Sequence, residues 1–443
     1  GQESDAGVWA AINSKFRAFS NESRILTSFD GPVNLLLGSY YQSSKRDHGE
    51  FVTFIGVINS AASPANKYLA FTKISPTKGE TISAFGQAIW KIVPEVELTA
   101  GARYTHETKK SSFFQPYVNP ALAGLFTPQT NNPATTLHRD QTFNNWSPEA
   151  TITWRPSKDL TVYAAYKTGY KSGGFSNSGI LSPADPNGDG MTFAPEKAKG
   201  FEGGIKSTLL DRQLRFNIGA YRYTYSGLQV DYFDPLSIRY ITRNAGSSKT
   251  RGIETELEFV PRSIDGLTIR STLNYSRSRY SNFLAPCWQG QSIGQGCVLQ
   301  TLPGQTASQF LQQLGGRPTA NAPKLTGSAG FEYDVPISSG MIFGLSSDFR
   351  FSSKYNSSAF DSPNGVQKSY SVIDASLRLR SESKGWELAL IGKNLTNRQY
   401  KTGVFDITGT GSGTGSVGGG IQSDIFQLTQ LPRTVQLQAT YRF

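Results

Sequence analysis

One segment of the chain carries oxygen side chains at a spacing typical of a calcium loop. The segment contains Asp185, Asn187, Asp189, a glycine and, at the twelfth position, Glu196. Alternating oxygen ligands, a glycine at the sharp turn and a late carboxylate can surround Ca²⁺. Such residues are also ordinary turn material, and Thr192 stands where calcium loops prefer an aliphatic residue. We therefore predict a candidate structural calcium site, with an ordinary turn as the alternative.

The two cysteines of the chain, Cys287 and Cys297, lie in one polar loop. Two cysteines are too few for a structural zinc site, and they lack the CxxC spacing of redox motifs. We predict a disulfide between them, formed in an oxidising compartment. Closing so short a loop contributes about 3 kcal/mol in the chain-entropy model. The loop should then lie on the periplasmic or external side of a membrane.

A set of aromatic and basic side chains falls where expected strands run into long loops. Such side chains can stack on an aromatic ligand and pair with an anionic one. The alternative is an aromatic belt that holds the protein at a membrane interface. The candidates for ligand contact are Tyr170, Phe175, Tyr223, Tyr225, Tyr232, Phe233, Arg239, Tyr240 and Arg243.

The residue pattern does not favour an enzyme. His48, His106 and His138 lie in separate segments and outside any metalloprotease or nucleophile-elbow motif. Glu254 and Glu256 are two residues apart on one strand face, where a hydrogen-bonded network is the simpler expectation. We predict no catalytic residue and no cofactor beyond the candidate calcium ion.

The final residues show the pattern of a membrane-spanning strand. Val435, Leu437, Ala439, Tyr441 and Phe443 alternate with Gln436, Gln438, Thr440 and Arg442. Outer-membrane β-barrels need an apolar face toward lipid and a polar face toward the lumen. The same alternation recurs at 96–105, 253–259 and 373–380. A basic residue facing lipid at the midplane costs about 2–4 kcal/mol, so the alternating charges must line water.

Short links alternate with long ones along the chain. The short links lie near 30–32, 94–95, 156–159, 209–212, 263–266, 337–340 and 382–385. The long segments lie near 45–78, 108–140, 172–193, 230–247, 282–321, 354–366 and 401–426. Transmembrane barrels have tight periplasmic turns and longer external loops. We predict an all-β fold, a transmembrane antiparallel β-barrel with about 15 or 16 strands in this chain and a wide lumen.

Composition agrees with a membrane barrel. Hydrophobic residues make up only 37% of the 443 residues, whereas aromatic residues make up 12%. No run of about 18 apolar residues is present, so no transmembrane helix is expected. The net charge is +11, but no dense Lys/Arg block or nucleic-acid motif accompanies it, and we expect no nucleic-acid partner.

Several short motifs follow one another in the second part of the chain. They are Trp146-Ser-Pro148, Tyr166–Phe175, Phe193-Ala-Pro-Glu196, Arg243-Asn-Ala-Gly246, Arg251-Gly-Ile-Glu254, Asn394-Leu-Thr-Asn397 and Tyr441-Arg-Phe443. In order and spacing they resemble the barrels of TonB-dependent outer-membrane receptors. The resemblance covers nearly all residues after about 140. It also gives Glu196 a place in a strand motif that needs no calcium.

The resemblance implies active uptake across the outer membrane of a Gram-negative bacterium. A scarce small-molecule ligand, usually a ferric siderophore, would bind the external loops and a plug domain. The energy-transducing protein TonB would then pull on the plug and release the ligand inward. Exposed basic residues would meet outer-membrane lipid and anionic lipopolysaccharide.

The chain also departs from this family. Its members have an N-terminal plug, a TonB box and a barrel of roughly 22 strands. Residues 1–443 resemble only the C-terminal portion of such a barrel, without the plug and without roughly the first six or seven strands. We expect these parts on another segment or chain, since unpaired sheet edges are untenable in lipid. The alternative is a passive porin-type channel of about 16 strands closed by this chain alone.

Overall fold

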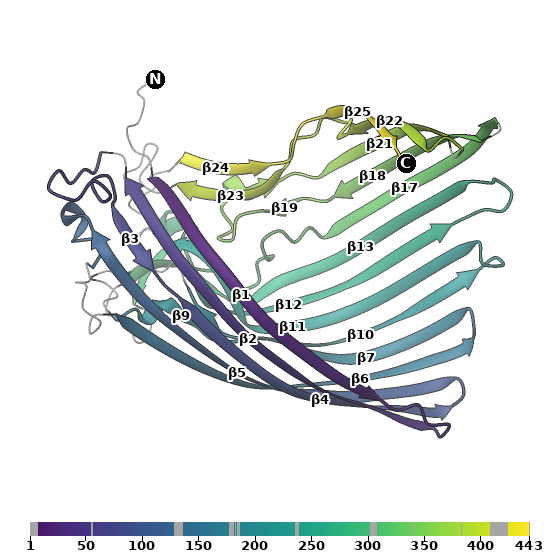
Figure 1. Cartoon of the computed structure of the whole chain (residues 1–443), viewed down its shortest axis with the longest axis horizontal. Helices are drawn as coiled ribbons and strands as arrows, with labels where there is room; N and C mark the ends of the chain where they lie inside the picture. Colours follow the sequence, from purple (N-terminus) through teal and green to yellow (C-terminus); the bar gives the residue numbers. More distant parts are fainter. Residues whose placement is uncertain are drawn as a thin grey trace.

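One long, curved antiparallel sheet dominates the computed structural model (Figure 1). The structure describes residues 8–54, 56–127, 136–176, 181, 183, 187–234, 239–301, 308–338, 340–381, 383–407 and 424–442. Helical structure in these residues is limited to short 3₁₀ turns: η1 (Pro120–Leu122), η3 (Asp189–Met191), η4 (Ile293–Gln295) and η5 (Pro363–Gly365). None of them is long and apolar enough to cross a membrane.

The main sheet contains 16 strands. They are β1 (Val8–Leu26), β2 (Val33–Phe54), β3 (Phe71–Ile74), β4 (Thr77–Val93), β5 (Val96–Val118), β6 (Leu137–Ser157), β7 (Leu160–Lys171), β10 (Glu196–Leu209), β11 (Leu214–Asp234), β12 (Arg239–Phe259), β13 (Leu267–Asn282), β17 (Leu325–Ser338), β18 (Met341–Ser352), β21 (Tyr370–Ser381), β22 (Trp386–Lys393) and β25 (Thr434–Tyr441). Because β3 and β4 both lie between β2 and β5, they form one interrupted strand. The expected all-β, antiparallel fold and its strand number are confirmed.

The short connections fall where the sequence predicts them, but the strands are longer than predicted. The segment 230–247 was expected to be a long loop, and this expectation is wrong. There β11 and β12 stay paired out to Asp234 and Arg239. Likewise β2 continues to Phe54 and β5 to Val118. In these extensions the alternation of apolar and polar residues fades, whereas the backbone pairing of the strands continues.

The sheet has one apolar and one polar face, because successive side chains of a strand point to opposite sides. A row on the apolar face runs through Ile205, Ile218, Thr255 and Leu273 on four neighbouring strands. The adjacent row on the polar face runs through Lys206, Asn217, Glu256 and Thr272. This is the arrangement that a barrel between lipid and water requires.

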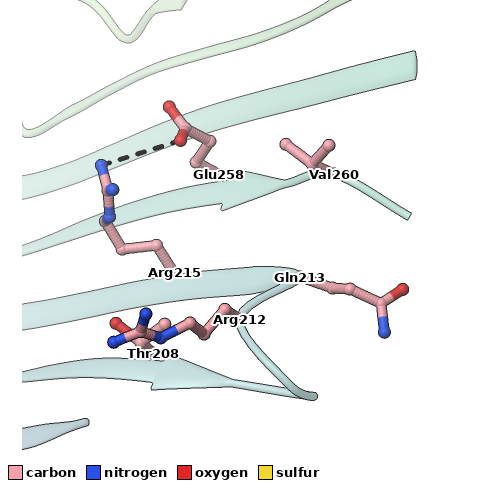
Figure 2. A pocket seen from close by; sticks show the side chains of 6 residues that line it. All are labelled: Thr208, Arg212, Gln213, Arg215, Glu258 and Val260. Carbon is pink, nitrogen blue, oxygen red and sulfur yellow. Dashed lines mark ion pairs between the residues drawn. The ribbon is translucent and has the colours of Figure 1, made fainter. Parts of the chain in front are cut away.

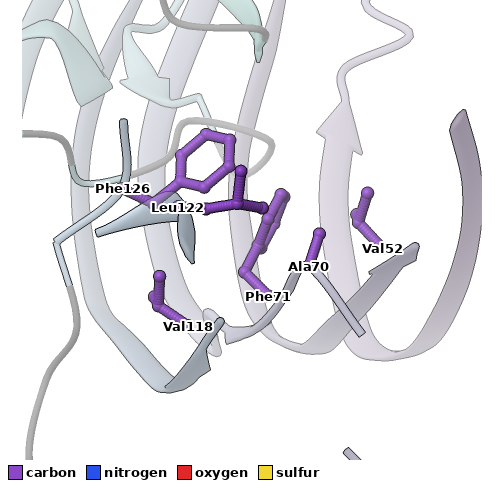
Figure 3. Close-up of a cluster of buried hydrophobic side chains, with 6 residues drawn as sticks. All are labelled: Val52, Ala70, Phe71, Val118, Leu122 and Phe126. Carbon is purple, nitrogen blue, oxygen red and sulfur yellow. The ribbon is translucent and has the colours of Figure 1, made fainter. Parts of the chain in front are cut away.

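Buried cores lie beneath the long connections at one end of the sheet. One cluster joins Val52, Ala70, Phe71, Val118, Leu122 and Phe126 (Figure 3). Small hairpins and sheets occupy the same end: β8 (Gly174–Phe175) with β9 (Thr192–Phe193), β14 (Leu284–Pro286) with β16 (Ser308–Gln313) and β15 (Val298–Thr301), β19 (Tyr355–Asn356) with β20 (Val366–Gln367), and β23 (Lys401–Ile407) with β24 (Asp424–Thr429). The short turns lie at the opposite end of the sheet (Figure 1).

The sheet is open. β1 and β25 stand at the two ends of the strand order, and within the described residues they are not paired with each other. β1 pairs along its 19 residues with β2 alone. The alternative prediction, a closed pore of about 16 strands formed by this chain alone, is therefore not what the structure forms.

Candidate functional site

The polar face is a wall of paired charges. Near the short turns, Arg378 contacts Glu332 and lies 3.7 Å from Asp334, and Arg380 lies 3.1 Å from Asp334. Arg350 pairs with Asp374 at 2.6 Å. Hydrogen-bonded pairs of this kind satisfy charges that cannot face lipid, so the wall is suited to water and polar solutes.

Aromatic rings lie flat on this wall over glycines of neighbouring strands. A Cβ on Gly252 would come within 2.6 Å of the Tyr221 hydroxyl, and one on Gly200 within 2.6 Å of the Tyr223 ring. The Tyr223 hydroxyl donates a hydrogen bond to Glu202 at 2.7 Å. Covering a strand glycine with a cross-strand ring is a known way to stabilise a sheet.

The loop between β7 and β10 is held to the wall by Asn244. Its side chain accepts a hydrogen bond from the Ala194 amide at 2.6 Å and donates to the Ala194 carbonyl at 2.8 Å. It also donates to the Gly227 carbonyl at 2.7 Å. The motifs Phe193–Glu196 and Arg243–Gly246 therefore meet in space, and their shared role is to fix a loop.

A second set of contacts extends this attachment. The Glu196 carboxylate accepts a hydrogen bond from the Gln229 amide at 2.9 Å, and the Gln229 side chain donates to the Ser172 carbonyl at 2.9 Å. Lys109 donates to the Ser172 hydroxyl at 2.7 Å and to the Gly173 carbonyl at 2.8 Å. The Glu196 carboxylate thus binds the backbone of β11 at Gln229.

A pocket opens on the polar face of β13, β17, β18 and β21, at the end with the long connections. Its volume is about 500 Å³, and the residues that line it include Asn274, Asn321, Arg350, Tyr355, Tyr370 and Tyr400. We call it the wall pocket. The wall pocket brings aromatic rings and several polar groups together on the polar face. This is the usual composition of a small-molecule site.

Three tyrosines give the wall pocket its chemistry. The rings of Tyr370 and Tyr400 are stacked, with centroids 3.9 Å apart and planes 11° apart. Tyr355 donates a hydrogen bond to the Lys401 carbonyl at 2.7 Å, and burial raises the pKa of Tyr355 above its usual value. Asn274 Oδ1 is buried and has no hydrogen-bond partner among the described residues. A buried acceptor without a partner favours a ligand that brings a donor.

The sequence did not single out this pocket. Tyr370 opens β21, and Tyr400 follows the Asn394 motif, so the two stacked rings are 30 positions apart. The Asn394 side chain explains how they meet, because it accepts from the Arg398 amide at 2.8 Å and donates to the Leu431 carbonyl at 3.0 Å. It thereby folds the chain back beside β21.

The predicted ligand residues are divided between wall and loop. Tyr223 and Tyr225 lie on the polar wall, opposite Gly200 and Ala198 of β10. Phe175 is only 7% exposed and lies in a loop core with Phe113, Leu181 and Met191, where a ligand cannot reach it. The Tyr170 hydroxyl is buried and unpaired among the described residues.

The other predicted ligand residues lie in the β11–β12 hairpin. Tyr232, Phe233, Arg239 and Tyr240 occupy paired backbone positions there, but their side chains lie outside the described part of the chain. Arg243 lies opposite Val230 in the same hairpin.

The predicted calcium site lies partly outside the described residues. Asp185 and the side chain of Asp189 lie outside the described residues. The Asn187 carbonyl accepts a hydrogen bond from Arg139. Among the described residues, no group of three or more His, Cys, Asp or Glu side chains could hold a metal. The calcium site stays a prediction.

Cys287 and Cys297 form a disulfide, with Cα atoms 5.8 Å apart. The cross-link lies in the loop sheet formed by β14, β15 and β16, and Phe310 packs against it. The Gln289 amide next to it donates to Asp406 of β23 at 3.0 Å. The disulfide therefore braces one loop against its neighbour.

A smaller pocket, of about 280 Å³, lies at the opposite end beside the turn between β10 and β11 (Figure 2). It is lined by Thr208, Arg212, Gln213, Arg215, Glu258 and Val260. Arg215 and Glu258 pair across it at 3.7 Å. Arg212 pairs with Asp159 outside the lining at 3.6 Å. Because both arginines already have carboxylate partners and none of the lining residues is aromatic, this pocket is a weaker candidate for a ligand site.

The apolar exterior, the polar wall and the alternation of short turns with long loops define an outer-membrane β-barrel sheet. The chain belongs to the family of TonB-dependent receptor-like β-barrels, whose model matches residues 3–395. The family and the structural relatives are transport receptors.

Solved structures share this fold at low sequence identity. The ferric yersiniabactin uptake receptor FyuA from Yersinia pestis matches with a TM-score of 0.70 and 14% identity, over 98% of this chain and 55% of that one. The siderophore receptor PiuA from Acinetobacter baumannii matches with a TM-score of 0.65 and 17% identity, over 97% of this chain and 56% of that one. The chain thus spans just over half the length of these relatives.

Proposed function

We propose that this chain forms part of the barrel wall of a receptor that imports a scarce metal chelate, such as a ferric siderophore, across the outer membrane. The wall pocket is the observation that supports it most. Stacked Tyr370 and Tyr400 offer a flat apolar surface, and the buried oxygen of Asn274 awaits a donor. FyuA and PiuA are named as receptors for such ligands.

The rest of the receptor is part of the proposal. A plug domain and further strands, on another segment or chain, would complete the barrel and cover the free edges of β1 and β25. TonB would supply the energy through the plug. The long connections would face the outside of a Gram-negative cell, because external loops are the longer ones in outer-membrane barrels.

Uptake by cells tests this function. A panel of ⁵⁵Fe-loaded chelates (catecholate, hydroxamate, phenolate and citrate) would be offered to cells with and without the receptor, each with and without TonB. We expect one class of chelate to enter only when both proteins are present. Entry that needs the receptor but not TonB would overturn active uptake in favour of passive diffusion. If no chelate depends on the receptor, the proposed ligand class is wrong.

A further inference from the structure

Three arginines stand side by side on the apolar face of the sheet. Arg222 of β11 lies directly opposite Arg251 of β12, which in turn lies opposite Arg277 of β13. All three side chains are exposed. We call this set the arginine row. Like charges directly opposite one another destabilise a sheet, so an arrangement of this kind calls for an explanation.

In the part of the chain that the structure describes, no acidic side chain neutralises the arginine row. Within the described residues, none of the three arginines makes an ion pair or a side-chain hydrogen bond. The nearest carboxylates on these strands, Glu202 and Glu254, occupy positions of the opposite, polar face.

More cations lie one row farther from the short turns. Lys249 stands between Thr224 and Arg279 across the three strands, and Lys199 of β10 lies opposite Thr224. Arg279 is partly engaged, since it donates to the Gly316 carbonyl. The positive charge therefore extends over two rows and four strands.

The neighbouring side chains give the depth of this patch in the membrane. The next row toward the short turns is apolar and contains Ala220, Ile253 and Tyr275, of which Ile253 is 47% and Tyr275 49% exposed. Phe201, opposite Arg222, packs on Tyr166 with ring centroids 5.1 Å apart. Aromatic belts mark the membrane–water interface. The arginine row thus lies at head-group level, on the side of the long loops.

We propose that the arginine row, together with Lys199, Lys249 and Arg279 in the next row of cations, binds the phosphates of a bisphosphorylated glycolipid in the outer leaflet. The guanidinium group of arginine can donate two parallel N–H hydrogen bonds to one phosphate. With strands about 4.8 Å apart and a rise of about 3.4 Å per residue, two rows across four strands measure about 14 by 7 Å. Such a patch can contact two phosphate groups at once. This inference goes beyond ligand uptake and does not depend on it.

Native mass spectrometry of the whole receptor, purified and delipidated in mild detergent, tests the proposal. The receptor would be titrated with bisphosphorylated lipid A, with monophosphoryl lipid A and with phosphatidylglycerol. The variant Arg222→Gln/Arg251→Gln/Arg277→Gln removes the row. The control Lys91→Gln/Lys158→Gln/Lys384→Gln removes the same charge from exposed positions near the short turns.

We expect bisphosphorylated lipid A to bind wild type at least tenfold more tightly than the row variant, with the control unchanged and monophosphoryl lipid A intermediate. Unchanged binding by the row variant, or an equal loss in the control, would overturn the site. Equal binding of phosphatidylglycerol and lipid A to wild type would overturn the glycolipid assignment. Should the triple variant fail to migrate as a folded barrel, Arg251→Gln alone takes its place, with an expected loss of about threefold.

Discussion

At the scale of single residues, the wall pocket depends on two stacked rings. Replacing Tyr400 with alanine removes the partner of Tyr370 and leaves one ring loose. We expect affinity for the chelate identified by uptake to fall about two- to tenfold, since aromatic pairs contribute about 0.5–1.5 kcal/mol. Fluorescence titration of the whole receptor measures this. The control Tyr400→Phe keeps the stacked rings and should bind the chelate as tightly as wild type. If Tyr400→Ala also binds as tightly as wild type, the wall pocket does not contact the ligand.

His48 is a second residue with a measurable consequence. It is 6% exposed, and burial, with help from the positive charges of Arg46 and Lys73, lowers its pKa from 6.5 to about 4. Burial also raises the pKa of the nearby Glu50 carboxyl, which Lys73 opposes. The histidine is therefore neutral in the folded state over a range where the unfolded chain would be protonated.

The sign of the pH effect follows from this lowered pKa. The unfolded state binds the extra proton between pH 6.5 and about 4. The stability contribution is therefore complete above pH 6.5 and is lost as the pH falls toward 4, by up to about 3 kcal/mol. We expect local opening of β2 and β3 near His48 in this window.

Hydrogen exchange, corrected for intrinsic pH dependence, measures this opening. His48→Gln should flatten the pH dependence of exchange around 48–52 and 71–75. His106→Gln is the control, because His106 contacts Asn144 on another part of the sheet. A steep pH dependence that survives in His48→Gln would assign the effect to other groups.

At the scale of elements, the sequence predicts strands and turns correctly where apolar and polar residues alternate and where tight turns join the strands. The turn at 30–32 and the alternation at 96–105 are found as predicted. The hairpin at 230–247 could not be predicted, because its pairing rests on backbone hydrogen bonds that many polar sequences can make. The wall pocket could not be predicted either, since its residues come from five separate segments.

Asn244 carries an element-scale prediction. Asn244→Ala removes three hydrogen bonds to Ala194 and Gly227, and we expect a cost of about 1–3 kcal/mol. Amide exchange should speed up around 192–196 and 226–229 while the ladder between β12 and β13 stays protected. Asn364→Ala is the matched control, because no side-chain hydrogen bond of Asn364 is found among the described residues. Unaltered exchange in Asn244→Ala would show that other contacts hold the loop.

At the scale of the whole molecule, the free edges of β1 and β25 decide how the chain behaves alone. An uncovered edge pairs with other chains. We expect the isolated chain, refolded in detergent, to form oligomers or aggregates, whereas the complete receptor should be a monomeric, heat-modifiable barrel. Size-exclusion chromatography with light scattering, together with non-boiled gels, separates these results.

The opposite result would revive the passive channel. A monomeric, heat-modifiable species from the isolated chain that conducts ions in planar bilayers would mean that the two edges can close on each other. The wall of paired charges would then be the lining of a pore, and TonB would have no part in transport.

The rings that lie over Gly200 and Gly252 have one more consequence. Tyr223 and Tyr221 lie against the sheet, and Phe85 likewise covers Gly38. These three rings therefore project little from the polar face. The space in front of the wall that upright rings would fill stays free. A folded domain that moved along this surface would therefore meet the faces of these three rings, and not ring edges that project from the wall.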